Sequence, residues 1–257
     1  MYPFLNALKN RNKILFYFGC FCCVGALISI LFILFTDRTV FGINAWIKPF
    51  KFFISSAIFA WTMAWYIYDL SISKRSVSSY SWVLVFVLLF ETIYIAIQAS
   101  KGELSHFNTS SAFYSMMFGL MGILITILTL WTAYIGILFF TKPTKNMPIA
   151  YLWGIRLGII TFVIFAFEGG IMAQKLTHTI GHPDGSEGLP ILNWSTQYGD
   201  LRVAHFLGMH ALQLFPFLGY YVFRKAPFII SFAMVYFALV SFSFWQALQG
   251  QSIFSLF

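Results

Sequence analysis

The chain has 257 residues, of which 60% are hydrophobic and only 9% are charged, and its mean hydropathy is +0.80. A soluble domain needs far more polar residues to cover its surface, so this composition indicates an integral membrane protein. The net charge is +8, but the basic residues are divided among short loops, which argues against a nucleic-acid partner.

Seven stretches are apolar and long enough to cross a bilayer, whose hydrocarbon core needs about 20 residues of helix. They do not alternate between apolar and polar residues, so they predict helices and not barrel strands. Together they use most of the chain, which predicts a single all-α transmembrane domain over residues 1–257, a seven-transmembrane-helix bundle. The predicted spans are residues 14–36, 44–69, 80–99, 111–140, 151–175, 200–222 and 227–250.

The distribution of lysine and arginine predicts the orientation, because loops rich in these residues face the cytoplasm. With a cytoplasmic N-terminus and an extracytoplasmic C-terminus, most of the basic residues lie inside. The short loops are typical of a bacterial cytoplasmic (inner) membrane protein. The basic residues on the predicted inner side are Lys9, Arg11, Lys13, Lys74, Arg75, Lys142, Lys145, Arg156, Arg224 and Lys225.

The first span, 14–36, contains all three cysteines, Cys20, Cys22 and Cys23. Their position inside a membrane helix excludes a disulfide framework. We interpret them as inert small hydrophobic residues.

The second span, 44–69, carries Lys48 and Lys51 near its outer start. Ser55 and Thr62 continue the same face inward at helical spacing. The two lysines alone would be explained by snorkelling to the interface, but the polar series behind them favours a ligand-binding role.

The third span, 80–99, places Glu91 and Gln98 on one face, and this face leads out to His106 in the following loop. An ionisable side chain inside a bilayer costs roughly 2.5 to 3.5 kcal/mol. We therefore expect Glu91 and His106 to be catalytic and Gln98 to bind a ligand.

The fifth span, 151–175, contains Glu168, which we also expect to be catalytic. The dipeptide Gly169-Gly170 follows it and favours a kink or a close backbone approach. The next segment, 175–198, is rich in turn residues and predicts an ordered loop, either purely structural or a lid over a site.

The sixth span, 200–222, has Arg202, His205 and Gln213 on one face and His210 at its margin, while Asp200 points away and begins the helix. The two histidines lie about 140° apart around the helix axis, so they do not form the metal-binding pair of an HExxH helix. We expect Arg202 and Gln213 to bind a ligand and His205 to be catalytic. His106, His205 and His210 are the candidate metal ligands.

These residues predict a polar pocket that opens to the outer side, and three functions remain open. The leading hypothesis is a membrane enzyme, such as an oxidoreductase, that uses a histidine-bound metal or haem. The alternatives are a proton-coupled transporter of a small anion and a cofactor-free lipid-processing enzyme. A purely structural network is the competing explanation. The expected partners are membrane lipid and a small-molecule or lipid substrate, and the sequence does not define an oligomeric state.

Overall fold

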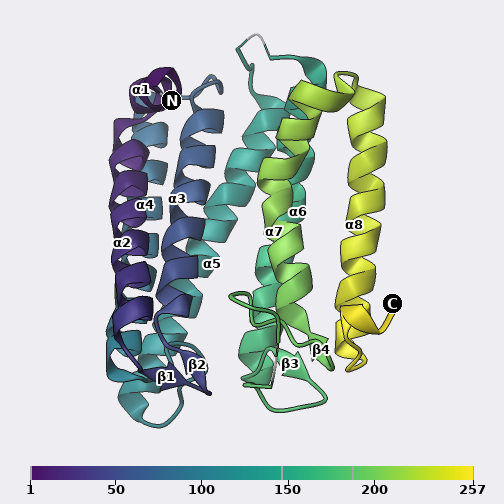
Figure 1. Ribbon diagram of the computed structural model, residues 1–257. Helices are drawn as coiled ribbons and strands as arrows, with labels where there is room; N and C mark the ends of the chain where they lie inside the picture. Colours follow the sequence, from purple (N-terminus) through teal and green to yellow (C-terminus); the bar gives the residue numbers. More distant parts are fainter. Residues whose placement is uncertain (1, 146, 187, 257) are drawn as a thin grey trace. The chain divides into compact units, whose positions relative to one another are not determined.

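The computed structural model describes residues 2–145, 147–186 and 188–256, which are mostly helical (Figure 1). In chain order the elements are α1 (Tyr2–Arg11), α2 (Lys13–Phe35), β1 (Thr39–Val40), β2 (Ile43–Asn44), α3 (Ile47–Ile67), α4 (Lys74–Lys101), α5 (Ala112–Thr141), α6 (Ile149–Lys175), β3 (Thr179–Ile180), β4 (Gly199–Asp200), α7 (Leu201–Leu218), the π-helix η1 (Gly219–Phe223), α8 (Ala226–Leu248) and the 3-10 helix η2 (Ile253–Leu256).

Seven helices in the described part of the chain are long and apolar enough to cross a membrane, which confirms the predicted all-α membrane bundle. The largest difference from a predicted boundary is at α4, which begins at Lys74 and not at residue 80. Ser73 caps this helix by accepting a hydrogen bond from the backbone N–H of Ser76, and polar residues fill its first turns. Hydropathy locates only the part of a helix that lies in lipid, so it missed this polar extension.

A short helix, α1, precedes the first span and was not predicted. Its last residue, Arg11, forms an ion pair with Asp69 at 2.6 Å, and its guanidinium lies 3.9 Å from the centre of the Trp65 ring. Asn12 then caps α2 by accepting a hydrogen bond from the backbone N–H of Leu15. These contacts attach α1 to the end of α3.

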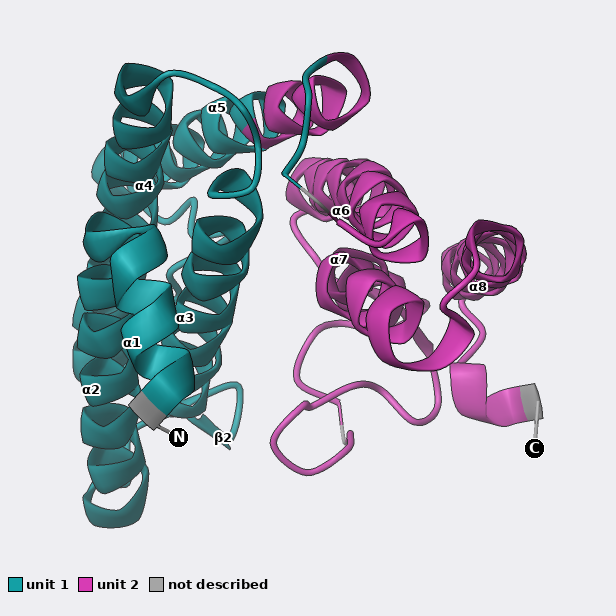
Figure 2. Cartoon of the chain, turned by 90° about the horizontal axis from the view of Figure 1, so that it is seen from above, with its two compact units in different colours: residues 1–131, 142–145 teal, residues 132–141, 146–257 magenta. Residues whose placement is uncertain are grey.

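The chain forms two compact units, and each is described by itself (Figure 2). Unit 1 contains Met1–Trp131 and Lys142–Lys145, and unit 2 contains Thr132–Thr141 and Asn146–Phe257. Helix α5 therefore contributes its first part to unit 1 and its last part to unit 2.

In unit 1, α2 packs closely along α3. A Cβ atom at Gly25 would lie 2.6 Å from the ring of Phe53, so any larger residue here would have to displace that ring. The hairpin of β1 and β2 connects the two helices at their shared end (Figure 1). Phe41 and Gly42 form its turn with φ values of 52° and 74°, the left-handed conformations of a tight hairpin.

In unit 2, α6 and α7 approach each other through glycines. A Cβ atom at Gly154 would lie 2.7 Å from the carbonyl oxygen of Phe215, and one at Gly158 would lie 2.9 Å from that of Ala211. Glycines four residues apart are a common device for bringing membrane helices together. This packing places one face of α6 directly against α7 along much of its length.

The segment between α6 and α7 folds at one end of unit 2. β3 pairs with β4 in antiparallel register, with Thr179 opposite Asp200. Tyr198 forms a bridge to Gln251 near the end of the described chain. The segment is thus an ordered structure attached to α7 and α8, as the turn residues predicted.

Candidate functional site

The most distinctive polar group in unit 2 is the side chain of Glu168, in the C-terminal half of α6. It is 6% exposed, and among the described residues neither of its carboxylate oxygens has a hydrogen-bond partner. Its Oε2 atom lies 3.4 Å from Nδ1 of His205 on α7, which is within ion-pair distance. Two of the residues predicted to be catalytic are therefore brought together.

The position of His205 is fixed by two neighbours on α6. Its Nδ1 lies 2.7 Å from the carbonyl oxygen of Phe165. Because a carbonyl only accepts hydrogen bonds, Nδ1 carries a hydrogen and donates it to this oxygen. A Cβ atom at Gly169 would lie 3.1 Å from Cε1 of His205, so this glycine makes room for the ring.

The surroundings of Glu168 determine what the pair can do. An ionised carboxylate in a membrane span is costly unless a cation or hydrogen-bond donors compensate it. The imidazole of His205 is in a position to do so, but it compensates the carboxylate only when it is protonated. The pair can therefore hold one proton, either on the carboxyl, as two neutral groups, or on the imidazole, as an ion pair, and release of that proton leaves the carboxylate uncompensated.

The other histidine of α7, His210, has a different environment. Its Nδ1 lies 2.9 Å from the carbonyl oxygen of Phe206, one turn earlier in the same helix, and its ring stacks on the Phe206 ring with centroids 4.0 Å apart. His210 is within electrostatic range of His205, but this hydrogen bond and this ring contact are local to α7. Gln213, also predicted to bind a ligand, is half-buried on the same helix.

Arg202 contacts the loop before α7. The predicted helix start at Asp200 is confirmed, because Asp200 caps α7 and accepts a hydrogen bond from the backbone N–H of Arg202 at 3.0 Å. The expectation that the two side chains point apart was wrong: Arg202 Nη2 lies 2.6 Å from Asp200 Oδ2 and also donates to the carbonyl of Asn193. Asp200 has extended backbone angles, so the helical rotation per residue does not apply to it.

The loop has a second anchor, the carboxylate of Asp184. It lies 2.9 Å from Nδ1 of His178, and it accepts hydrogen bonds from the Thr177 hydroxyl at 2.8 Å and the Thr179 backbone N–H at 3.0 Å. Burial opposes ionisation of this carboxyl, but these partners together hold its pKa well below its usual range. The segment from Thr177 to Asp184 is therefore folded around a largely buried carboxylate.

Unit 1 holds a second polar group, in which Lys48 is within electrostatic range of both Glu91 and His106. Glu91 is buried on α4. His106 lies in the loop after α4, where burial and the charge of Lys48 lower the pKa of its imidazole. Lys51, one turn further along α3, is half-buried.

The loop that carries His106 is folded against α4 and the neighbouring helix α3. The His106 ring lies 5.6 Å from the Phe52 ring of α3, and Gln98 donates a hydrogen bond to the carbonyl of Leu104 at 3.0 Å. Between Glu91 and Gln98, the hydroxyl of Tyr94 is buried and has no hydrogen-bond partner in the described residues. The predicted polar face of this helix is thus buried.

The predicted site residues fall into both units. No group of three or more histidine, cysteine, aspartate or glutamate side chains that would hold a metal ion occurs within residues 2–145, 147–186 and 188–256. Unit 1 contains Lys48, Lys51, Glu91, Gln98 and His106, and unit 2 contains Glu168, Arg202, His205, His210 and Gln213.

Two features of the site were not predicted from the sequence, the close contact of α6 with α7 and the contacts of Asp184. The spacing of Gly154 and Gly158 was a readable signal for the close contact of α6 and α7, which brings Glu168 next to His205. The binding of Asp184 by residues 177–179 had no such signal, because it depends on the folded path of the loop.

Comparisons with known proteins give no match for this chain, whether with family models, with curated proteins or with solved structures.

Proposed function

We propose that this protein is a proton-coupled membrane carrier of a small anion, in which Glu168 and His205 hold the coupling proton. The observation that supports it is the buried Glu168 carboxylate, which has no hydrogen-bond partner in the described residues and lies 3.4 Å from His205. An ionisable group placed inside a membrane span at this cost is a feature of proton relays.

Two properties of the pair favour transport of a proton over a purely structural role. A network that only fixes packing would satisfy the carboxylate oxygens with hydrogen bonds, since unsatisfied buried acceptors are destabilising. Here the short hydrogen bond of His205 goes to the carbonyl of Phe165, and Glu168 keeps the longer ion-pair contact. Loss of the proton that the pair shares would therefore leave the carboxylate without compensation, which gives its binding and release a large energetic consequence.

The anion is suggested by the basic residues of unit 1. Lys48 and Lys51 lie in the first turns of α3, and His106 is within electrostatic range of Lys48. Glu91 compensates part of this charge. A small carboxylate or phosphate is the kind of solute that such a group would attract.

The two enzyme hypotheses have no comparable support. A histidine-bound metal would need a group of ligands, and the described part of the chain contains no such group of three. For a haem enzyme or a lipid-processing enzyme, the described residues give no support beyond the presence of the predicted histidines and basic side chains. The distribution of basic residues favours a cytoplasmic N-terminus, and the short loops remain the reason to expect a bacterial inner membrane.

The proposal is tested by proton flux in proteoliposomes that contain a pH-sensitive dye. Gradients of acetate, lactate and phosphate are imposed in turn, and we expect at least one of them to drive proton movement that depends on the protein. Glu168→Gln should remove this flux, whereas Glu103→Gln, a change at an exposed carboxylate, should not. Flux that is unchanged in Glu168→Gln, or absent from the unmodified protein with all three anions, would contradict the proposal.

A further inference from the structure

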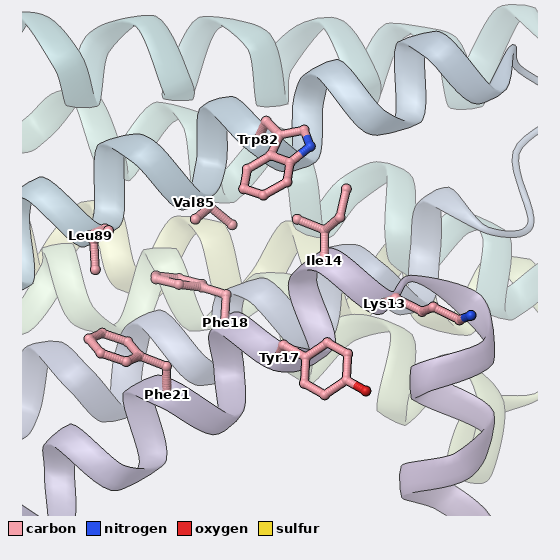
Figure 3. Close-up of a pocket in the computed structure, with 8 residues that line it drawn as sticks. All are labelled: Lys13, Ile14, Tyr17, Phe18, Phe21, Trp82, Val85 and Leu89. Carbon is pink, nitrogen blue, oxygen red and sulfur yellow. The ribbon is translucent and has the colours of Figure 1, made fainter.

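Unit 1 contains an apolar groove between α2 and α4, far along the chain from Glu168 and His205 (Figure 3). The cavity has a volume of about 460 Å³. Its lining includes Ile14, Phe18 and Phe21 on α2 and Val85 and Leu89 on α4. From Lys13 to Phe21 the groove follows α2 for about 12 Å.

The two ends of the groove differ in chemistry. Lys13 and Tyr17 lie at one end, and Phe21 and Leu89 lie at the other (Figure 3). Lys13 is exposed and is the first residue of α2, so it lies where the polar α1 gives way to the apolar span. A lysine at this point belongs at the level of the lipid headgroups.

A second lysine contributes to the charged end. The Nζ atom of Lys9, on α1, lies 5.5 Å from the centre of the Tyr17 ring, a cation–π distance. The chain contains no aspartate or glutamate before Asp37 and none between residues 74 and 90, so neither wall of the groove supplies an acid from these stretches. The end of the groove therefore has a local excess of positive charge.

The walls are held in register by a buried hydrogen bond. Nδ2 of Asn12 donates to the hydroxyl of Ser81 at 2.8 Å, which links the start of α2 to α4. The next residue on each helix, Lys13 and Trp82, lines the groove. Tyr17 and Trp82 are the aromatic types that concentrate at the membrane interface.

From this arrangement we infer that the groove is a binding site for one anionic phospholipid. An acyl chain occupies the apolar part, since α2 and α4 are membrane spans and the surrounding medium is lipid. The phosphate and its anionic headgroup lie against Lys9 and Lys13. A zwitterionic lipid fits less well, because the groove walls offer no carboxylate for its ammonium group.

The inference is tested with the full chain, purified in detergent and stripped of lipid. The thermal unfolding midpoint is followed while phosphatidylglycerol or phosphatidylcholine with the same acyl chains is added, and bound lipids are counted by native mass spectrometry. We expect phosphatidylglycerol to bind saturably and to raise the midpoint more than phosphatidylcholine. Equal effects of the two lipids would overturn the inference.

Charge variants test the headgroup contact. Each of Lys9→Gln and Lys13→Gln should weaken phosphatidylglycerol binding about fivefold, the effect expected for one basic residue at an anionic membrane surface. Lys101→Gln makes the same change at the opposite end of α4 and should leave binding unchanged. Undiminished affinity in both groove variants would show that the lysines do not hold a headgroup.

A steric variant tests the acyl chain without changing charge. Val85→Trp fills the groove and should abolish saturable binding, whereas Ile93→Trp, at an exposed site on α4 beyond the lining residues, should not. Full binding in Val85→Trp would contradict the site. This variant also keeps the inference testable if the loss of Lys9 or Lys13 prevents folding.

Discussion

Nδ1 of His205 lies between two oxygens of α6: it is 2.7 Å from the carbonyl of Phe165 and 3.4 Å from Oε2 of Glu168. The carbonyl keeps a hydrogen on Nδ1 in every protonation state. The carboxylate of Glu168 therefore lies beside a ring nitrogen whose short hydrogen bond goes to the backbone of α6.

The approach of α6 to α7 depends on Gly154, where an added Cβ would lie 2.7 Å from a backbone carbonyl of α7. Gly154→Ala should destabilise the protein by about 1 to 3 kcal/mol, because backbone cannot move aside as a flexible side chain does. Gly170→Ala, in the same helix with nothing within 4 Å, should be neutral or stabilising. Thermal unfolding in detergent compares the two, and equal effects would refute the close helix contact.

The carboxylate of Asp184 should make the stability of the loop before α7 depend on pH. Its carboxyl pKa is lowered from the ordinary value of 3.8, so the stability it contributes is complete above that pH and is lost as the pH falls through the folded pKa. Hydrogen exchange at the Thr179 amide should accelerate as the pH is lowered below about 4, relative to the intrinsic rate.

The substitution Asp184→Asn should remove this dependence. Exchange at the Thr179 amide should then be at least about tenfold faster at neutral pH, since hydrogen bonds to a charged acceptor contribute roughly 1.5 to 3 kcal/mol. Asp37→Asn, at an exposed carboxylate in unit 1, is the control. An unchanged exchange rate in Asp184→Asn would mean that the carboxylate does not organise the loop.

Arg202 should act mainly on the loop that it contacts, because its guanidinium is bound to Asp200 and to the carbonyl of Asn193. Arg202→Ala should increase protease cleavage near Asn193 and cost about 2 kcal/mol. Arg202→Lys should recover only part of this stability, since a lysine ammonium cannot reproduce the planar guanidinium contacts with both Asp200 and the Asn193 carbonyl. Lys175→Ala, at an exposed cation, serves for comparison, and normal protease resistance in Arg202→Ala would disprove this role.

The predicted orientation can be tested within unit 2 by cysteine labelling, after replacement of the three native cysteines. Thr196→Cys, at an exposed position of the loop before α7, is better suited than a cysteine at Gly185, whose φ of 102° strains any other residue. An impermeant thiol reagent should label Thr196→Cys on intact cells and Lys225→Cys only after permeabilisation. The reverse pattern would invert the topology.

The spans could be predicted from the sequence because the hydrophobic effect acts on composition over some twenty residues, without reference to distant contacts. Helix α1 could not, because it is held by the contact of Arg11 with Trp65 and Asp69, more than fifty residues away in the chain. The division into two units could not be predicted either, because it also depends on contacts between residues that are far apart in the chain.

The candidate site was predictable only in part. Intramembrane charge indicated Glu168 and His205 individually, since each is costly in lipid. Their pairing depends on the helix contact at Gly154 and Gly158, and the partner of Arg202 depends on a loop conformation that helical geometry does not describe.

The most direct test of the proton site is infrared difference spectroscopy of the protein in lipid while the pH is changed. In a Glu91→Gln background, which removes the band of the other buried membrane carboxyl, we predict a carbonyl band from a protonated, buried carboxylic acid that appears on acidification and is lost when Glu168→Gln is added. In His205→Gln the band should appear at a different pH, because the partner that compensates the carboxylate is gone. A titrating band that survives in the double variant Glu91→Gln/Glu168→Gln, or a Glu168 that keeps one protonation state wherever the protein is folded, would contradict the account.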